Sequence, residues 1–401
     1  MRGLSILFVT VRFPLPLRTG DRARAYQQVR LLARRHRVTL ATFLDTSPTA
    51  QAARAEIERL GVRVVSVPFS RPAAALRVAQ SLPGSTPLQV ALFDAAPLRR
   101  TIATLLEQEP FDLVHALLAR AVPLVPVESR VPLFVDLVDA LSLNMRRRAA
   151  HDRGPMAWAA RLDATRLAAY ERDVCARAAG ASVVTMRDRE ALDAPAGVAI
   201  NPNGVDVADF PFENGPRVPD QLVFTGNLGY FPNVEAVTWL AHQVLPRIWR
   251  TRPACSLTIV GARPHRRIRA LATDPRIRIE ADVPHMHPFL ARASVAVTPM
   301  MTGSGQLLKV LEAMASGAPV VATSRALNGL DVAPDVHALV GDDPDGFARA
   351  VLSLLASPAE GQRLAAAARA LVESRYTWEH SVGQLEHLHA AAVALPIPAT
   401  A

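Results

Sequence analysis

The sequence predicts an α/β fold in which two doubly wound, Rossmann-like domains follow one another along the chain and face each other across a central cleft. Three observations lead to this prediction. The 401 residues exceed the length of one ordinary hydrophobic core and suggest two domains. Short apolar runs rich in β-branched residues alternate with helical stretches, which is typical of a parallel sheet covered on both faces. The alternation stops at VAINPNGVDVADFPFENGPRVPD (198–220), a segment rich in Pro, Asn, Asp and Gly, and then restarts.

The first domain is expected to cover residues 1–197. Its first apolar run, LSILFVTV (4–11), is short and no small-residue cleavage site follows it, so it predicts a buried strand rather than a signal peptide. Strands are expected at 5–11, 38–43, 62–67, 113–116, 133–137 and 181–185. Helices are expected at 23–35, 51–60, 98–107 and 156–178.

The second domain is expected to cover residues 198–375, with a last segment, 376–401, that crosses back to the first domain as a helix. The stretch 361–393 has helical character throughout. Strands are expected at 222–225, 256–260, 276–280, 295–298, 320–323 and 338–340. Further helices are expected at 234–250, 307–315 and 347–355.

Charge and composition limit the class of protein. The formal net charge is +9, which suits phosphorylated ligands or an anionic membrane surface, but an Arg-rich composition explains it equally well. No nucleic-acid-binding motif accompanies the charge, so nucleic acid is not an expected partner. No run of 18 apolar residues predicts a transmembrane helix. The two cysteines, Cys175 and Cys255, are far apart and suit a reducing compartment. We expect a cytoplasmic protein with a peripheral contact at the inner face of the cell membrane.

Ligands of doubly wound sheets bind outside the carboxyl ends of the strands, and three sites in the first domain follow predicted strands. Gly20 lies at the first strand–helix turn, where the backbone and a helix N-terminus can meet an anion. His115 ends the strand at 113–116, although a buried histidine is more often a core residue. Asp136 and Asp139 follow the strand at 133–137, where a carboxylate can orient a hydroxyl or act as a base. Asp139 is equally suited to capping the next helix.

The second domain repeats the pattern at three turns. Gly226 and Asn227 follow the strand at 222–225, and Gly261 with Arg263 follows the strand at 256–260, where the arginine can reach a diphosphate. Each of these also suits an ordinary turn. The third turn belongs to the segment GSGQLLKVLEAMASGAPVVAT (303–323).

This segment combines a glycine-rich loop with the start of a helix, which is an anion-binding arrangement. Lys309 and Glu312 stand three residues apart on one side of that helix, so a surface ion pair is an alternative to ligand binding. A carboxylate at this distance from the loop can also accept hydrogen bonds from ribose hydroxyls. The loop residues are Gly303, Ser304, Gly305, Gln306 and Leu307.

At this segment the sequence resembles the family 4 retaining glycosyltransferases of the GT-B class, and above all their bacterial exopolysaccharide- and exosortase-associated branch. The branch pattern G-x-G-x-x-x-K-x-L-E-A-M-A-x-G-x-P-V-V-A-T fits residues 303–323 nearly throughout. Four more segments are similar to this branch: FPLPLRTGDRARAY, NPNGVD, TGNLGYFPNVEAV and RYTWE. The resemblance therefore extends over almost the whole chain.

The resemblance implies a UDP- or GDP-sugar as donor substrate, held mostly by the second domain, and a glycan or lipid-linked acceptor. It implies no metal and no tightly bound cofactor, since helix N-termini and basic side chains stabilise the leaving diphosphate. Glu312 takes the place of the ribose-binding glutamate, and Lys309 that of a phosphate ligand. Gly20 would lie by the diphosphate, and His115 by the transferred sugar. The loop 303–307 lies where backbone amides meet the donor.

Three departures accompany the resemblance. Ser304 replaces the first glutamate of the pair that many members carry, which leaves the donor sugar open. The segment YFPN (230–233) lacks the usual lysine after the second domain's first turn, and the usual Gly–Gly of the first loop is Thr19–Gly20. A sugar-nucleotide 2-epimerase and a non-catalytic binding subunit of the same fold therefore remain alternatives.

Overall fold

The computed structural model describes residues 3–17, 19–151, 153–193, 197–212, 215–302 and 305–395. It divides into two compact units, one holding the residues up to Pro202 together with those from Val382 onward, and the other running from Asn203 to Ser381. The first division falls after Pro202 rather than after residue 197, because residues 198–200 form a strand of the first unit's sheet. The second falls after Ser381 rather than after residue 375, because Val205 pairs with Thr377 in the second unit.

The first unit is built on a parallel sheet whose described strands have the order β3-β2-β1-β4-β5-β6-β7. The core strand β1 is buried at every residue, as its uninterrupted apolar sequence predicts. The strands are β1 (Ser5–Thr10), β2 (Arg37–Phe43), β3 (Arg63–Val67), β4 (Leu113–Leu117), β5 (Leu133–Val138), β6 (Gly180–Val183) and β7 (Val198–Ile200). The last of these lies inside the stretch expected to be a linker.

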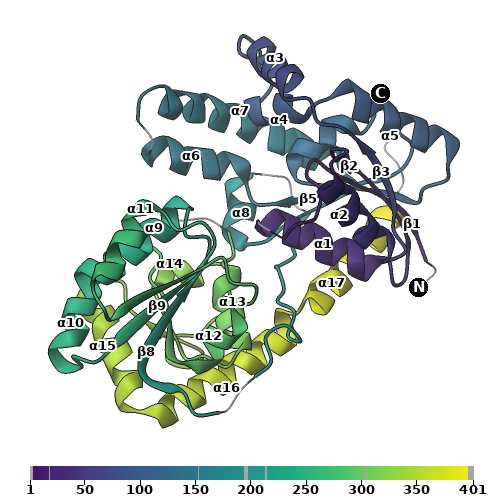
Figure 1. The fold of residues 1–401 in the computed structure, drawn as a ribbon. Helices are drawn as coiled ribbons and strands as arrows, with labels where there is room; N and C mark the ends of the chain where they lie inside the picture. Colours follow the sequence, from purple (N-terminus) through teal and green to yellow (C-terminus); the bar gives the residue numbers. More distant parts are fainter. Residues whose placement is uncertain are drawn as a thin grey trace. The chain divides into compact units, whose positions relative to one another are not determined.

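Helices cover both faces of this sheet (Figure 1). They are α1 (Gly20–Leu32), α2 (Pro48–Glu58), α3 (Arg71–Ser81), α4 (Leu88–Phe93), α5 (Ala96–Gln108), η1 (Ala119–Leu124), α6 (Leu141–His151), α7 (Pro155–Arg177), α8 (Met186–Ala191) and the part of α17 (Trp378–Ala394) from Val382 onward. The unpredicted helix α3 begins with a local signal, since Ser70 accepts a hydrogen bond from the amide of Ala73 and a proline follows in the first turn.

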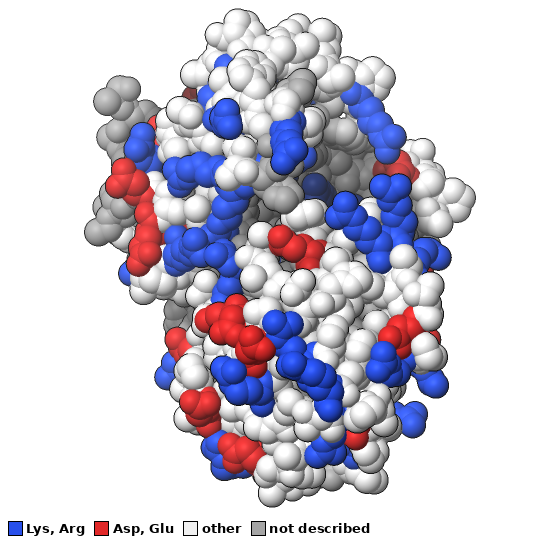
Figure 2. All heavy atoms as spheres, turned by 90° about the vertical axis from the view of Figure 1, so that its left-hand side faces the viewer, with Lys and Arg blue, Asp and Glu red and all other residues white. Residues whose placement is uncertain are grey.

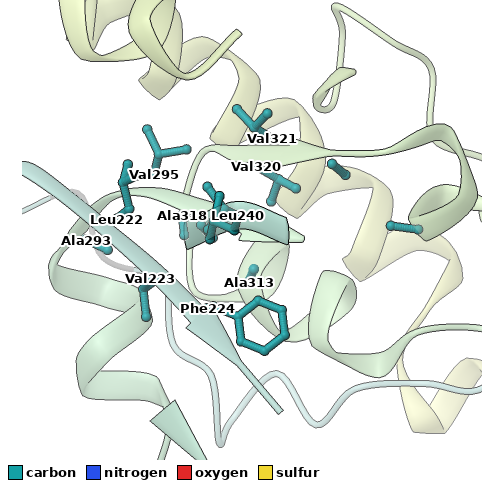
Figure 3. Packing of buried hydrophobic residues seen from close by; sticks show 14 of the residues in the cluster. Leu222, Val223, Phe224, Leu240, Ala293, Val295, Ala313, Ala318, Val320 and Val321 are labelled. Carbon is teal, nitrogen blue, oxygen red and sulfur yellow. The ribbon is translucent and has the colours of Figure 1, made fainter. Parts of the chain in front are cut away.

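The second unit is built on a parallel sheet whose described strands have the order β10-β9-β8-β11-β12-β13. Its strands are β8 (Val218–Thr225), β9 (Ser256–Gly261), β10 (Ile277–Ala281), β11 (Ala293–Thr298), β12 (Val320–Ala322) and β13 (Leu339–Val340). Figure 3 shows side chains of β8, β11 and β12 packed with Leu240 and Ala313 from covering helices. Burial of this apolar surface is the main stabilising contribution to the unit.

The helices of the second unit are α9 (Phe231–Trp239), the π-helical turn η2 (Leu240–Val244), α10 (Leu245–Thr251), α11 (Arg266–Arg269), η3 (Ala270–Thr273), α12 (His287–Arg292), α13 (Leu308–Ala315), α14 (Ser324–Leu327), α15 (Pro344–Ala356) and α16 (Pro358–Arg375). The expected helix at 234–250 is interrupted at η2, next to Pro246, whose nitrogen has no hydrogen to donate. No helix within the described residues is long and apolar enough to cross a membrane.

The C-terminal stretch expected to be helical throughout is broken between α16 and α17. The carbonyl of Tyr376 accepts a hydrogen bond of 2.8 Å from the amide of Val205, and Thr377 forms a bridge with the same residue. The backbone here therefore pairs with residues more than a hundred positions earlier, which removes it from the helical hydrogen-bond pattern. α17 then begins at Trp378.

Candidate functional site

The order of the second sheet predicts where that unit binds a ligand. The connections from β8 and β11, which are hydrogen-bonded neighbours, lead to opposite sides of the sheet. Such a switch in strand order opens a crevice at the carboxyl ends of the two strands. The turn after β8 and the loop before α13 both lie at this edge, so the structure brings these two segments together as the sequence predicts.

Two glycines let the backbone of this edge pack closely. Gly261 has φ of 153°, and a Cβ atom on it would lie 1.7 Å from the carbonyl oxygen of Gly226. Gly226 has φ of 152°, and a Cβ atom there would lie 2.7 Å from Nζ of Lys309. A side chain at Gly261 would collide with backbone, and one at Gly226 would displace the end of Lys309, so the two glycines let this edge pack closely around the lysine.

Lys309 is the cation of the crevice. Its Nζ donates a hydrogen bond of 2.6 Å to Oδ1 of Asn233, and it lies 4.2 Å from the centre of the Phe224 ring. Burial lowers the pKa of Lys309 to about 7, against the opposing effect of the nearby Glu312 charge. An anion bound beside Nζ would provide the negative counter-charge that Lys309 lacks. It would raise the pKa of Lys309 and so favour the protonated ammonium.

Glu312 lies one turn further along α13 and is half-buried. Burial raises the pKa of its carboxyl to about 7, and the Lys309 charge opposes the rise. Its side chain makes no hydrogen bond or ion pair with any described residue, so the surface ion pair considered for Lys309 and Glu312 is not formed. Both carboxylate oxygens are therefore available to hydroxyl donors.

The loop before α13 is described only in part. Gly303 and Ser304 lie outside the described residues. Gly305 has φ of 72°, and Leu307 precedes the helix with extended backbone and no side-chain cap on the helix amides. Gln306 is buried, and its Oε1 accepts a hydrogen bond of 2.6 Å from the amide of Asn203. Its Nε2 has no hydrogen-bond partner in the described part of the chain.

Asn227 and Arg263 stand at the same edge. The carbonyl of Asn227 accepts a 2.8 Å hydrogen bond from Nδ2 of Asn233, and its Oδ1 accepts one of 3.1 Å from the amide of Gly229. Asn227 thus shapes the turn that positions Asn233. Arg263 has an exposed side chain and φ of 53°, and its amide donates to Oδ1 of Asp282.

The first unit has its own switch point, between β1 and β4. Gly20 is the first residue of α1 there, and nothing lies within 4 Å of where its Cβ would be. Asp21 forms an ion pair of 3.0 Å with Arg12. Arg120 lies nearby, and its pKa is lowered to about 10 by burial and by the charge of Arg12. Sequence reasoning assigned no role to Arg12 or Arg120.

The structure does not support a direct role for His115 in catalysis. β4 continues to Leu117, so His115 lies in the middle of the strand and is fully buried. Its ring stacks on Phe8 with 4.4 Å between centroids, and its Nδ1 lies 2.9 Å from Nε2 of His389 in α17. Burial lowers the pKa of His115 to about 4. We assign it to the core, the alternative that the sequence left open.

The two aspartates after β5 differ in environment. Asp136 is fully buried and accepts hydrogen bonds of 2.6 Å from Nε of Arg24 and 2.7 Å from Nε2 of Gln28, which makes it a structural group. Asp139 is half-buried and follows Val138, whose φ of 65° is strained for a β-branched residue.

Burial and the Asp188 charge raise the pKa of Asp139 to about 7. Asp139 does not cap α6, whose first amides are bound by other carboxylates. The amide of Ala140 donates to Asp188, and that of Leu141 donates to Glu171 over 2.6 Å. This carboxyl is therefore a half-buried acid at a strand end with a pKa near neutrality, which suits proton exchange with a hydroxyl.

Sequence reasoning missed the residues that support the cation. Asn233 and Phe224 flank Lys309, and Thr302 donates a 2.6 Å hydrogen bond to Oε2 of Glu235 in the same region. The first two lie inside the segment TGNLGYFPNVEAV or directly before it. The signal that could have drawn attention to Asn233 is the missing lysine of that segment, YFPN (230–233), which ends at the residue that binds Lys309.

Comparisons with known proteins find similarity over the second unit and over the fold as a whole. Residues 219–357 match the model of the family described as Glycosyl transferases group 1, a range that contains the crevice of the second unit. The chain is 35% identical over 195 residues to a glycogen synthase of Mycobacterium tuberculosis, covering 44% of each protein. It is 29% identical over 202 residues to a GDP-mannose-dependent monoacylated alpha-(1-6)-phosphatidylinositol monomannoside mannosyltransferase of Corynebacterium glutamicum, covering 44% of this chain and 52% of that one. The matches thus span about half the length of these relatives.

Solved structures resemble the chain over nearly its whole length. Anabaena HepE in complex with UDP-glucose superposes with a TM-score of 0.68 at 16% identity, covering 97% of this chain and 100% of that one. Sucrose-phosphate synthase from Thermosynechococcus elongatus gives a TM-score of 0.69 at 17% identity, covering 96% and 98%. At these identities the likeness concerns the fold. The predicted class, two Rossmann-like domains of the GT-B type, is confirmed.

Proposed function

We propose that this chain is a glycosyltransferase that moves a sugar from a nucleotide-diphosphate sugar to a glycan or lipid-linked acceptor, with retention, in exopolysaccharide or cell-surface glycan synthesis. The observation that carries the proposal is the crevice of the second unit. There a half-buried ammonium and an uncapped helix start stand one turn from a carboxylate without a partner among the described residues. This is a site for an anion flanked by hydroxyls, as in a nucleoside diphosphate.

The donor's groups are assigned to these residues by chemistry. Lys309 and the first amides of α13 would bind the diphosphate, which approaches the backbone at Gly226 and Gly261. Glu312 would accept hydrogen bonds from the ribose hydroxyls. HepE was solved with UDP-glucose, and the Corynebacterium relative is named for GDP-mannose, so both bases belong in the donor test.

In the proposed reaction the acceptor hydroxyl oxygen bonds to the anomeric carbon while the bond from that carbon to the β-phosphate oxygen breaks. The leaving diphosphate takes the electron pair. Its charge would be stabilised by Lys309 and the α13 amides, whose orientation is fixed before the reaction. With attack on the face from which the diphosphate departs, the acceptor's proton passes to the leaving phosphate, and the anomeric configuration is retained.

The first unit would receive the acceptor. Asp139 lies at the carboxyl edge of its sheet with a raised pKa, and would orient the acceptor hydroxyl through a hydrogen bond. The name of the Corynebacterium relative specifies an inositol-phospholipid acceptor, and the arginines of the first unit suit a similar anionic interface. We therefore include a peripheral contact with the cytoplasmic face of a membrane in the proposal.

Two alternatives predict different outcomes for a nucleotide sugar. A sugar-nucleotide 2-epimerase of the same fold would convert a UDP-sugar into its epimer. A non-catalytic binding subunit would bind nucleotide without turnover. The carboxyl of Asp139 with its shifted pKa favours a catalytic chain over the binding subunit.

The purified protein is incubated with UDP- and GDP-sugars in turn, and released nucleotide and sugar products are separated by chromatography. Slow release of UDP or GDP is expected even without acceptor, because water can replace the hydroxyl. Glu312→Gln should weaken donor binding by about 1–3 kcal/mol, the cost of losing charged hydrogen bonds. Glu280→Gln, at a half-buried carboxyl on β10, is the matched control and should bind normally.

Failure to bind or hydrolyse any of these donors would refute the proposal. An epimerised nucleotide sugar would establish the first alternative, and nucleotide binding without turnover in the presence of a membrane extract as acceptor would establish the second. The anomeric configuration of a transferred sugar, determined by NMR, decides between retention and inversion.

A further inference from the structure

Helices α6 and α7 of the first unit line a surface groove of about 590 Å³ that the proposed reaction does not use. Its floor is made of small side chains, and three arginines stand on its walls. The lining residues are Arg146, Ala149 and Ala150 of α6, and Arg161, Ala164, Thr165, Ala168 and Arg172 of α7. The groove is therefore shallow, accessible and cationic.

The α7 side of the groove continues into an exposed aromatic residue. Trp158, Arg161, Thr165, Ala168 and Arg172 are spaced by three and four residues, so they share one face of the helix. The side chain of Trp158 is 61% exposed, which is unusual for a tryptophan. A large amphipathic ring thus stands at the end of a row of arginines.

The acidic side chains of α7 do not neutralise this face. Asp163 is buried and accepts a 2.6 Å hydrogen bond from the amide of Leu88. Glu171 is buried against the first amides of α6, and Asp173 is paired with Arg177 over 2.7 Å. Within the described residues the α7 carboxylates therefore form no ion pair with the three groove arginines, although the charge of Glu171 acts on Arg146.

The arginines themselves have few internal partners. Arg161 is exposed, and its guanidinium makes no hydrogen bond or ion pair with any described residue. Arg146 makes a 3.5 Å hydrogen bond to the carbonyl of Ala191. Arg172 has an exposed ion pair of 3.3 Å with Asp193, and such pairs contribute little. Figure 2, which views the side where α6 and α7 lie in Figure 1, shows Lys and Arg side chains over the upper part of that surface.

We propose that this groove docks on an anionic membrane surface, with lipid phosphates between the arginines and the Trp158 ring in the interfacial region. Guanidinium groups form paired hydrogen bonds to phosphate oxygens, and tryptophan favours the boundary between headgroups and acyl chains. The alanine floor leaves room for a headgroup between the two helices. The groove would be the surface through which the protein makes the membrane contact of the proposed function. The inference rests on that function in one respect: a lipid-linked acceptor would be located in the membrane.

The full chain is mixed with vesicles of phosphatidylcholine containing 30% phosphatidylglycerol, at about 0.1 M salt, and the bound fraction is measured by sedimentation. Each arginine at an anionic surface is worth about a factor of five, so Arg161→Gln with Arg172→Gln should lower the partition coefficient roughly 30-fold. Arg325→Gln with Arg349→Gln removes the same charge from exposed positions in the second unit and should lower it by less than about threefold.

Trp158 offers a second readout, because it is the exposed one among the four tryptophans. Its fluorescence should shift to shorter wavelength when phosphatidylglycerol vesicles are added, and Trp158→Phe should abolish the shift while keeping most of the binding.

The proposal is wrong if the wild-type protein fails to bind these vesicles or binds pure phosphatidylcholine equally well. It is also wrong if the two double variants lose binding equally, or if emission does not shift. Donor hydrolysis by the double variant at Arg161 and Arg172 is measured in the same preparations without lipid. Retained hydrolysis with lost vesicle binding separates this surface from the reaction, whereas absent hydrolysis in the wild type counts against the proposed function alone.

Discussion

The ammonium of Lys309 on α13 donates a 2.6 Å hydrogen bond to the side-chain oxygen of Asn233 on α9. The two residues are 76 positions apart, and the contact joins the helix after β8 to the helix after β11. Asn233 in turn donates to the carbonyl of Asn227, which fixes the direction of its own oxygen. The side-chain amide of Asn233 therefore positions the Lys309 ammonium, and the backbone carbonyl of Asn227 positions that amide.

Replacing Asn233 by alanine should weaken nucleotide binding. The variant removes the acceptor that holds Lys309, so the lysine loses its fixed direction toward the ligand. We expect the affinity for UDP or GDP, whichever the wild type binds, to fall by about 1–3 kcal/mol in titration calorimetry. Asn328→Ala, at an exposed asparagine after α14, should leave the affinity unchanged. Equal affinities in all three proteins would contradict the role of this contact.

Nucleotide binding should change the protonation of the crevice, in opposite directions at high and low pH. The pKa of Lys309 is lowered to about 7, and a bound diphosphate raises it, so at pH 8 binding takes up protons. The pKa of Glu312 is raised to about 7, and hydrogen bonds to its charged form lower it, so at pH 6 binding releases protons.

Calorimetry in buffers of different ionisation enthalpy measures this exchange. Lys309→Met should remove the uptake at pH 8, and Glu312→Gln should remove the release at pH 6. Proton exchange of one sign at both pH values would rule out this pair of titrating groups.

Gly261→Ala should destabilise the second unit. The added methyl group would lie 1.7 Å from the carbonyl oxygen of Gly226 at a backbone conformation that L-residues rarely adopt. We expect the free energy of unfolding to fall by about 2–3 kcal/mol, the scale of overpacking with backbone displacement. Gly20→Ala is the control, because it meets nothing within 4 Å and should change stability by less than about 0.5 kcal/mol. Chemical unfolding followed by circular dichroism compares the two variants.

The buried pair of His115 and His389 should make the first unit less stable in acid. Burial lowers the pKa of His115 to about 4, and that of His389 is lowered as well, first by burial and then by the charge of His115. The unfolded chain therefore binds more protons than the folded one between pH 6.5 and pH 4. Stability is present above this range and is lost as the pH falls through it, by about 3 kcal/mol for His115.

Hydrogen exchange in β4 and α17, measured from pH 7 to pH 4, reports this loss. His115→Leu with His389→Leu should flatten the pH dependence, whereas His242→Gln, at an exposed position, should preserve it. A double leucine variant with the wild-type slope would show that other groups cause the acid sensitivity.

The strands were predictable from the sequence because their signal is local. The central strands carry apolar runs, as β1, β9 and β11 do, and the expected ranges overlap β1 to β6 and β8 to β13. β7 was missed because its three residues, Val198–Ile200, are followed by the turn residues of NPNGVD. Helix α3 was missed because its apolar residues do not form a buried helical face, as the exposed Leu76 illustrates, and α4 because its six residues are too short for a helical period.

The site was predictable where one segment carries it and not where distant segments meet. The start of α13 with Lys309 and Glu312 can be recognised from one motif. The residues around Lys309 come from β8 and α9, and the ring that partners His115 comes from a helix 274 positions later. No periodicity or spacing in the chain encodes such a contact. The resemblance implies a place for His115 by the transferred sugar, whereas its burial in the middle of β4 fits the core alternative that its position in an apolar strand left open.

The last described helix has a consequence for the order in which the chain is completed during synthesis. The first unit needs α17, because His389 fills the space beside His115 and Phe134. The whole second unit is translated before that helix leaves the ribosome. The sheet of the first unit is synthesised first, but its core cannot be completed until α17 has been synthesised. The first unit therefore completes its packing only after the whole second unit has been translated.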